Sequence, residues 1–255
     1  YYSFTDYGNE KDYYGMVEKI LSHSKFQSES AKKMKREIEI TSDGSRTLYV
    51  PGLDEHYHSI KGALAESRHI FIDMGLNHHS SSQLHILEIG FGTGLNAFLT
   101  LLAAEEMVKK VHYTGIELYP LEMDVLRELA YPDTINIERS EDYYRLHQAE
   151  WDKDETITPA FTLHKIKGDF TKYEFPKEFF DIIYFDAFAP EKQPEMWSQC
   201  LFDALYRSLN IGGILTTYCA KGVVRRMLQS SGFEVERLPG PPGGKREILR
   251  GIKRK

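Results

Sequence analysis

The sequence predicts an α/β protein with a doubly wound, mostly parallel sheet, and three observations support this fold class. An apolar segment at residues 84–89 is followed by a turn with glycine at positions 90, 92 and 94. A helical pattern of apolar residues begins directly after this turn. Short apolar segments and amphipathic segments then alternate through the rest of the chain, as they do in nucleotide-binding α/β domains.

Length and composition are those of an ordinary globular protein. The 255 residues are 41% hydrophobic and 27% charged, which allows a sizeable core. No apolar stretch is long enough to span a membrane and no signal peptide is visible, so we expect no membrane partner. Cys200 and Cys219 are the only cysteines, which favours the reducing cytoplasm over a disulfide framework.

Charge is distributed unevenly along the chain. The formal net charge is −6, which argues mildly against a nucleic-acid partner, yet residues 201–255 hold 11 Lys/Arg against 4 Asp/Glu. A basic C-terminal region on an acidic body is compatible with binding a folded RNA at one site. The same charges fit a solvated tail and charged helix ends about equally well.

The N-terminal part of the chain is expected to hold an extension and a small cap. Residues 1–33 are tyrosine-rich and then polar, and we interpret them as an N-terminal extension that is either non-native or disordered. Segments 37–41 and 46–50 flank a Ser-Asp-Gly-Ser turn, which predicts a β-hairpin. With a helical pattern at 56–74, residues 34–80 are predicted to form a hairpin and helical cap on a main domain of residues 81–255.

Strands and helices are predicted to alternate in the main domain. The expected helices are 95–108, 121–130, 194–209 and 223–230, with residues 131–160 as an insertion that contains one short helix. The expected strands are 84–89, 111–117, 161–167, 180–185 and 213–219, followed by a terminal antiparallel pair at 233–238 and 246–252.

The spacing of the glycines indicates which ligand the turn accepts. A dinucleotide site has the spacing G-x-G-x-x-G and holds a pyrophosphate at the helix N-terminus. In this chain Glu88 precedes Gly90-Phe91-Gly92-Thr93-Gly94, and Asn96 follows. Because a carboxylate beside the turn would repel phosphate, the pattern favours S-adenosylmethionine, which has a sulfonium and an ammonium but no phosphate. The alternative interpretation is a plain glycine turn without a ligand.

Carboxylates also follow the next strands, where ligands of doubly wound sheets lie. Glu117 could accept both ribose hydroxyls of an adenosine, and Asp169 the adenine amino hydrogen, with Phe170 beside the ring. Asp186 would face the donor methyl, where it could orient an amine nucleophile and take its proton. Each acid taken alone is more often a helix cap or a turn former, so the combination carries the argument.

Other polar residues are weaker candidates. The basic residues that fit either phosphate contacts or a solvated face are Lys221, Arg225, Lys245 and Arg246. No spacing of histidines, cysteines and acids supports a metal site, so we expect no metal. Cys219 is expected to be a small buried residue rather than a nucleophile.

Further motifs accompany the glycine turn and point to one family. They are Asp43-Gly44-Ser45, Tyr57-His58-Ser59, Gly62-Ala63, Glu66-Ser67, residues 87–96, Asp186-Ala-Phe-Ala-Pro190, residues 194–197, residues 218–226, and residues 232–250 with Lys245-Arg246-Glu247. Over about residues 37–252 the chain resembles the methyltransferase domain of the tRNA-modifying MnmC family and its stand-alone relatives. Many methyltransferases share the glycine turn, whereas Asp-Ala-Phe-Ala-Pro together with the C-terminal Lys-Arg-Glu is much more specific.

The resemblance implies a class I, Rossmann-like methyltransferase with S-adenosyl-L-methionine as its cofactor. The implied reaction converts 5-aminomethyl-2-thiouridine to 5-methylaminomethyl-2-thiouridine at the wobble position, with the tRNA anticodon arm as partner. The residues that would hold the donor by resemblance are Glu88, Gly90, Gly92, Gly94, Glu117 and Asp169, while Asp186 would face the amine. Those in the family's N-terminal motif, which would close over the donor, are Tyr57, Ser59 and Glu66.

The implied acceptor base must be flipped out of the anticodon stack into the pocket. The aromatic candidates to stack on it, of which at least one is expected in the core instead, are Phe188, Trp197 and Tyr184. The flavin domain of MnmC has no counterpart here, so no FAD is expected. A separate enzyme, or another cellular route, would then supply the aminomethyl uridine.

Two other functions stay open at the level of the sequence. One is a small-molecule amine methyl- or aminopropyl-transferase, since polyamine aminopropyl enzymes use an acid after the same strand. The other is a nucleotide-binding module without turnover, against which the complete glycine turn and Asp186 argue. Dependence on tRNA separates the first function from the second, and any turnover separates both enzymes from the module.

Overall fold

A computed structural model describes residues 35–255, so the interpretation of residues 1–33 as an extension lies outside the described residues. Residues 37–255 form one unit. Its elements are β1 (Glu37–Ile40), β2 (Arg46–Val50), β3 (Glu55–His56), α2 (Ala63–Ser67), η1 (Arg68–Asp73), η2 (Leu76–His78), β4 (Gln83–Ile89), α3 (Leu95–Glu106), β5 (Lys110–Glu117), α4 (Met123–Leu129), α5 (Tyr131–Ile135), η3 (Ile137–Arg139), α6 (Ser140–Gln148), β6 (Asp154–Thr158), β7 (Phe161–Lys167), η4 (Phe170–Lys172), β8 (Phe180–Phe185), η5 (Pro194–Met196), α7 (Gln199–Ser208), β9 (Leu209–Thr217), α8 (Gly222–Ser231), β10 (Glu234–Pro239) and β11 (Glu247–Ile252).

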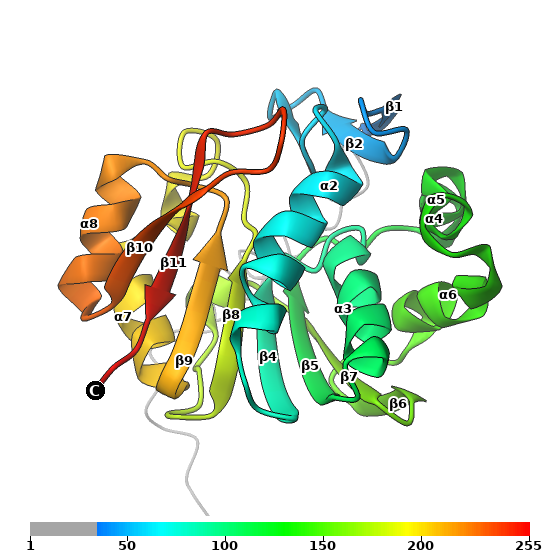
Figure 1. Ribbon diagram of the computed structural model, residues 1–255. Coiled ribbons are helices and arrows are strands. Elements are labelled where there is room, and N and C mark those ends of the chain that lie inside the picture. The colour runs from blue at the N-terminus through cyan, green and yellow to red at the C-terminus, as the bar shows by residue number, and fades with distance from the viewer. Residues whose placement is uncertain (1–34) are drawn as a thin grey trace, which may run out of the picture. The chain divides into compact units, whose positions relative to one another are not determined.

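The main sheet has eight strands in the order β10-β11-β9-β8-β4-β5-β7-β6 (Figure 1). The five strands from β9 to β7 in this order are parallel. The terminal strands β10 and β11 and the edge strand β6 pair antiparallel with their neighbours. These pairings confirm the predicted doubly wound class and its C-terminal antiparallel strand pair.

Helices cover both faces of this sheet, as Figure 1 shows for α3 and α7. Successive side chains of a strand point to opposite faces. Accordingly, the ring of Tyr184 in β8 packs 5.0 Å from that of Phe71 in η1, whereas its neighbour Phe185 packs 5.2 Å from Phe202 in α7. Burial on both faces explains why β8 is apolar from Ile182 to Phe185. Among the described helices, none is long and apolar enough to cross a membrane.

The strand order reverses between β4 and β8, and this reversal positions the candidate site. From β4 the chain continues to β5 and β7 on one side and returns to β8 and β9 on the other. The backbone amide of Asp186, just after β8, donates to the carbonyl oxygen of Ile89, the last residue of β4, at 3.1 Å. Ligands of doubly wound sheets bind outside the strand ends at such a reversal.

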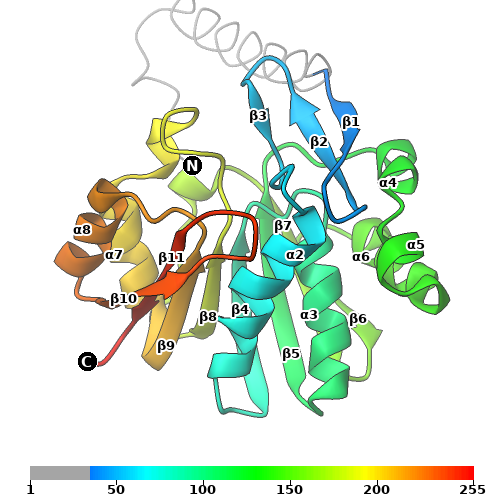
Figure 2. The same ribbon diagram turned by 45° about the horizontal axis from the view of Figure 1, so that its top comes forward.

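A second, three-stranded antiparallel sheet, β1-β2-β3, lies at the carboxyl ends of the parallel strands (Figure 2). Its first two strands are the predicted hairpin, which is thereby confirmed. The Asp43 carboxylate in the hairpin turn accepts hydrogen bonds from the Ala65 amide of α2 at 2.9 Å and from the Ser45 amide at 3.1 Å. A Cβ at Gly62, where φ is 142°, would lie 2.8 Å from the same carboxylate. The hairpin therefore caps α2.

Three predicted segments differ from the structure. The helix expected at 56–74 begins only at Ala63, because Gly62 and the Asp43 cap fix its start, and it continues as the π-helix η1. The helix expected at 194–209 is a short 3₁₀ turn followed by α7, since the Ser198 hydroxyl accepts from the Leu201 amide at 3.3 Å and starts a new helix. The fifth strand, β9, begins at Leu209 rather than at residue 213.

The segment 131–160, expected as an insertion with one short helix, is more ordered than predicted. It contains α5, the 3₁₀ turn η3, α6 and the edge strand β6. Helix α6 buries only Tyr143 and Leu146, and β6 buries only Ile157 and Thr158. Each of these elements buries only two residues, so its apolar pattern is short and the sequence shows no strong period.

Candidate functional site

The glycine turn after β4 presents backbone rather than side chains to the crevice. Gly90, Gly92 and Gly94 have φ values of 88°, 49° and 69°, a region that other residues resist. A Cβ on Gly94 would lie 2.5 Å from Nε2 of His147, and one on Gly90 would lie 2.8 Å from the carbonyl oxygen of Asp186. Glycine is therefore required for both conformation and space at these positions.

Thr93 is the most heavily anchored residue of this turn. Its hydroxyl bonds Nε2 of His58 at 2.8 Å, and its carbonyl oxygen accepts from the Tyr143 hydroxyl at 3.0 Å and from Nε2 of His147 at 3.1 Å. Burial lowers the pKa of His58 to about 4 and that of His147 to about 3, so both rings are neutral at physiological pH. Residues from α6 and from the loop after β3 thus hold the turn rigid.

Asn96, in the first turn of α3, connects the two strand-end acids Glu88 and Asp186. Its side-chain nitrogen donates to Oε1 of Glu88 and to Oδ2 of Asp186, each at 2.8 Å. Its side-chain oxygen bonds the Ser67 hydroxyl, which fixes the orientation of the amide. The structure therefore brings together three of the predicted site residues, Glu88, Asn96 and Asp186, with Ser67 as an additional member.

The two bridged carboxyl groups differ in their surroundings. Glu88 is fully buried, and this loss of solvent raises its pKa well above the ordinary value. Its Oε2 has no hydrogen-bond partner among the described residues. Asp186 is partly accessible, and desolvation raises its pKa to about 7, while the Asn96 hydrogen bond opposes this shift. Asp186 can therefore exchange a proton near neutral pH, whereas burial disfavours the charged form of Glu88.

The acids after β5 and β7 have local partners. Glu117 accepts from the Gly92 amide at 2.9 Å and from the Tyr119 amide at 2.7 Å, so it closes the glycine turn from the neighbouring strand end. Asp169 accepts from the Thr171 amide at 3.0 Å and pairs with Lys172 at 3.0 Å, which makes it the cap of η4. Contacts of both acids with an adenosine stay predictions.

The N-terminal motif lies against the turn, on the side of the small sheet. The ring of Tyr57 would lie 3.2 Å from a Cβ on Gly92 and packs edge-on against the Phe188 ring at 5.2 Å. The Ser59 amide donates to Oε1 of Glu66 at 3.1 Å. The structure therefore places Tyr57 against the glycine turn and joins Ser59 to Glu66, and their closure over the donor stays a prediction.

The aromatic candidates for base stacking separate into two groups. Trp197 and Tyr184 are buried in the core, and only Phe188 has an accessible ring. The Trp197 indole N–H donates to the carbonyl oxygen of Phe188 at 2.7 Å, and the Tyr218 hydroxyl donates to that of Ala187 at 2.8 Å. Trp197 and Tyr218 thus hold the loop that carries Asp186, and neither role is evident from the sequence.

The four basic candidates do not form one cluster of free cations. Lys221 pairs with Glu191, and Lys245 pairs with Glu66 at 2.6 Å. Arg246 is exposed, and Arg225 is half-buried with no hydrogen-bond partner for its Nε among the described residues. Of the four, Arg246 is the residue best placed to reach a phosphate in solution.

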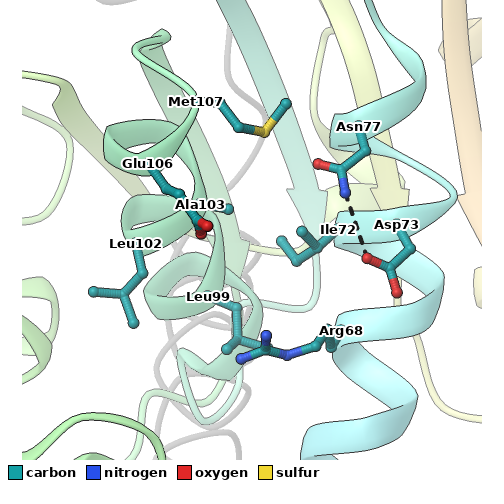
Figure 3. A pocket seen from close by; sticks show the side chains of 9 residues that line it. All are labelled: Arg68, Ile72, Asp73, Asn77, Leu99, Leu102, Ala103, Glu106 and Met107. Atoms are coloured by element: carbon teal, nitrogen blue, oxygen red, sulfur yellow. Dashed lines mark hydrogen bonds between the residues drawn. The ribbon is translucent and has the colours of Figure 1, made fainter.

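A separate cavity of about 510 Å³ lies between η1 and α3 (Figure 3). Leu99, Leu102 and Met107 line it on one side, and Ile72 and Arg68 on the other. None of the residues predicted for the site lines it. This cavity is therefore separate from the predicted site residues at the strand ends.

The residues at the strand ends have the chemistry expected for S-adenosyl-L-methionine. Left-handed glycines bring backbone close to a ligand, and the carboxylates of Glu117 and Asp186 lie at the neighbouring strand ends. These acids fit a cationic donor with ribose hydroxyls and would disfavour a pyrophosphate. Among residues 35–255, no group of His, Cys, Asp and Glu could hold a metal ion.

Comparisons with known proteins agree with this assignment. Residues 142–254 match the family described as S-adenosyl-L-methionine-dependent methyltransferase. The tRNA 5-methylaminomethyl-2-thiouridine biosynthesis bifunctional protein MnmC of Cupriavidus metallidurans is 32% identical over 225 residues, 82% of this chain. The protein of the same name from Pseudomonas fluorescens is 33% identical over 216 residues, 78% of this chain. The chain spans 32% of the length of each of these relatives.

One solved structure resembles nearly the whole fold. The crystal structure of MNMC2 from Aquifex aeolicus matches with a TM-score of 0.67 at 21% identity, over 97% of this chain and 85% of that one. Together these similarities confirm the predicted S-adenosyl-L-methionine-dependent methyltransferase fold and the resemblance to the methyltransferase part of the MnmC proteins.

Proposed function

We propose that this S-adenosyl-L-methionine-dependent methyltransferase methylates the aminomethyl nitrogen of 5-aminomethyl-2-thiouridine at the tRNA wobble position. The observation that carries the proposal is the placement of Asp186. It follows β8, contacts the β4 end through its backbone, and is bridged to Glu88 by Asn96. The printed names of the MnmC relatives, which refer to tRNA 5-methylaminomethyl-2-thiouridine biosynthesis, supply the candidate acceptor.

Asp186 has two tasks in the proposed reaction. S-adenosyl-L-methionine, when bound, supplies an electrophilic methyl group on its sulfonium. The Asp186 carboxylate accepts an N–H of the neutral amine and so points the nitrogen lone pair at that methyl carbon. The nitrogen–carbon bond forms as the carbon–sulfur bond breaks with its electron pair left on sulfur. Asp186 then takes the proton of the new ammonium, for which a pKa of about 7 is suitable.

Neighbouring residues hold Asp186 in the orientation that these tasks need. The Ser67 hydroxyl bonds Asn96 Oδ1, so the amide nitrogen must face Glu88 and Asp186. Burial raises the pKa of Glu88, which disfavours a second negative charge beside Asp186. The free Asp186 oxygen is therefore the one available to the amine.

The acceptor side of the proposal involves Phe188 and the tRNA anticodon arm. Phe188 is the accessible aromatic residue of the three candidates, and a flipped base could stack on it beside Tyr57. A separate enzyme would supply the aminomethyl uridine, and a tRNA substrate places the reaction in the cytoplasm. Arg246 on the loop before β11 would contact phosphate.

Methyl transfer to defined tRNA pools tests the proposal. Two pools, identical except that only one carries 5-aminomethyl-2-thiouridine, are incubated with the enzyme and methyl-labelled S-adenosylmethionine. We expect label only in the pool that carries the amine, and in the position of that nucleoside after digestion. Label in neither pool, with donor binding intact, would contradict the proposal and redirect the search to small amines.

A further inference from the structure

Lys245 lies between a carboxylate and an aromatic ring at the edge of the site. Its Nζ is 2.6 Å from Oε2 of Glu66 and 4.3 Å from the centre of the Tyr218 ring. The side chain of Glu66 is only 10% exposed, whereas that of Lys245 is 39% exposed. A carboxylate on one side and an aromatic face on the other are the two groups that proteins use to hold alkylammonium ions.

This arrangement is joined to the reactive centre on both sides. Glu66 precedes Ser67, whose hydroxyl bonds the Asn96 amide that holds Asp186. On the opposite side, the Tyr218 hydroxyl donates to the carbonyl oxygen of Ala187 at 2.8 Å. Burial is the largest cause of the raised Asp186 pKa, and beyond it the charge of Glu66 raises this pKa and the charge of Lys245 lowers it. The ammonium of Lys245 is therefore within electrostatic reach of the proton acceptor.

We propose that Glu66 and Tyr218 form a subsite for a primary alkylammonium group, and that Lys245 is an internal occupant which the ligand's ammonium replaces. This inference rests on the proposed function, because it names the group that the site exchanges during substrate binding. Lysine Nζ and an aminomethyl group are both primary ammonium groups on a CH₂, so one can substitute for the other chemically.

The two partners of this ion pair differ in how easily they can leave it. Lys245 belongs to the loop between β10 and β11, where Gly243 has open space around its Cβ position. A partly exposed lysine gains little net energy from an ion pair and regains side-chain freedom on release. Glu66 is nearly buried, and a buried carboxylate without a partner is costly. The cost of leaving the Glu66 carboxylate unpaired therefore favours replacement of the Lys245 ammonium by a ligand ammonium over departure of Lys245 alone.

An ammonium group could reach this subsite from two sources. One is the protonated aminomethyl group of the acceptor, which would release a proton to water before it reacts as the neutral amine at Asp186, and the other is the α-ammonium of the donor. Both would interact in the same way with Glu66 and Tyr218. One measurement therefore tests the subsite itself, and separate measurements distinguish the two sources.

Binding of ethylammonium chloride tests the subsite without any tRNA. Saturation-transfer NMR at pH 8 compares the wild type with Lys245→Met, Glu66→Gln and the double variant. We expect Lys245→Met to bind ethylammonium roughly tenfold more tightly than the wild type, which is 1.4 kcal/mol, and the double variant to lose this gain. Equal binding by Lys245→Met and the double variant would overturn the proposal, whether or not the tRNA reaction is correct.

Lys245→Arg is a second variant that keeps the ion pair with Glu66, so its effect on binding does not depend on a folding defect caused by loss of the pair. A guanidinium can pair with the Glu66 carboxylate through two hydrogen bonds and is harder to displace. We expect ethylammonium to bind this variant more weakly than it binds the wild type. Binding as tight as that of Lys245→Met would contradict the exchange.

The source of the ammonium is separated by measuring the donor Kd and the acceptor KM in Lys245→Met. A several-fold lower KM with an unchanged donor Kd assigns the subsite to the acceptor, and the reverse pattern assigns it to the donor. Arg246→Met, the neighbouring exposed cation, is the matched control and should raise KM and reduce its salt dependence. If Lys245→Met behaves like Arg246→Met, Lys245 is a phosphate contact and the proposal fails.

Discussion

The proposed function divides the strand-end site into two sides that are built in opposite ways. The donor side is the glycine turn, a contiguous stretch of backbone whose Thr93 is fixed by His58, Tyr143 and His147. The acceptor side, so named because the flipped base is proposed to stack on Phe188, is formed by side chains from segments far apart in the sequence, which are Glu66, Phe188, Tyr218 and Lys245. Under the proposed function, rigid backbone would hold the common ligand, whereas exchangeable side-chain contacts would lie on the side of the specific one.

Asp186 lies where the two sides meet. Asn96, which belongs to the donor side, orients its carboxylate, and the charges of Glu66 and Lys245 on the acceptor side act on its pKa. Mutations can therefore disrupt each side separately. Their effects on the orientation and the pKa of Asp186 should combine at this residue.

The largest expected effect is that of Asp186→Asn. Asparagine can still accept from Asn96 but cannot take a proton, so methyl transfer should fall by about 10²- to 10⁴-fold while donor binding is retained. Single-turnover rates and calorimetric donor binding measure the two effects. A rate within a few-fold of the wild type would remove Asp186 from the mechanism.

The stability of Asp186→Asn relative to the wild type should increase toward alkaline pH. The pKa of Asp186 is raised in the folded protein, so ionisation destabilises the fold as pH rises from about 4 to about 7. Asp186→Asn removes this loss, and its Tm relative to the wild type should be higher at pH 8 than at pH 5. The opposite dependence on pH would mean that the folded protein favours the carboxylate.

A pair of glycine substitutions compares the rigidity of the two sides. Gly94 and Gly243 both have positive φ, but an added Cβ meets His147 at Gly94 and nothing within 4 Å at Gly243. Gly94→Ala should cost about 2–4 kcal/mol from strain and overpacking and should weaken donor binding. Gly243→Ala should cost about 1 kcal/mol and leave the donor Kd unchanged. Urea denaturation checks both values, and equal costs would contradict the difference in rigidity.

A smaller effect is expected at the Asp43 cap. Asp43→Ala removes the hydrogen bond to the first turn of α2, and loss of such a cap costs about 1–2 kcal/mol. Asp54→Asn is the control, because Asp54 is exposed and pairs with Lys192 and Tyr49 at the surface, and asparagine tolerates its φ of 49°; this change should cost below about 0.5 kcal/mol. If both variants lose the same stability, the hairpin does not anchor α2.

Most of the main sheet and the donor side could be predicted from the sequence because their signals are local. The β8 segment is apolar on both faces, and the three glycines stand between a strand and a helix. The acceptor side could not be predicted in detail, since nothing near Lys245 in the sequence points to Glu66 or Tyr218. His147 and Trp197 were missed as supports for the same reason: their partners, Thr93 and Phe188, lie in other elements.

The most direct test of the account is the pH dependence of kcat/KM in the wild type and in Asn96→Ala, at saturating donor. The wild-type rate should fall as pH drops through about 7, because Asp186 becomes protonated. Asn96→Ala removes a hydrogen bond that lowers this pKa, so its profile should move to higher pH. Titration of the acceptor amine affects both profiles equally, so the displacement isolates Asp186. Coincident profiles would contradict the account.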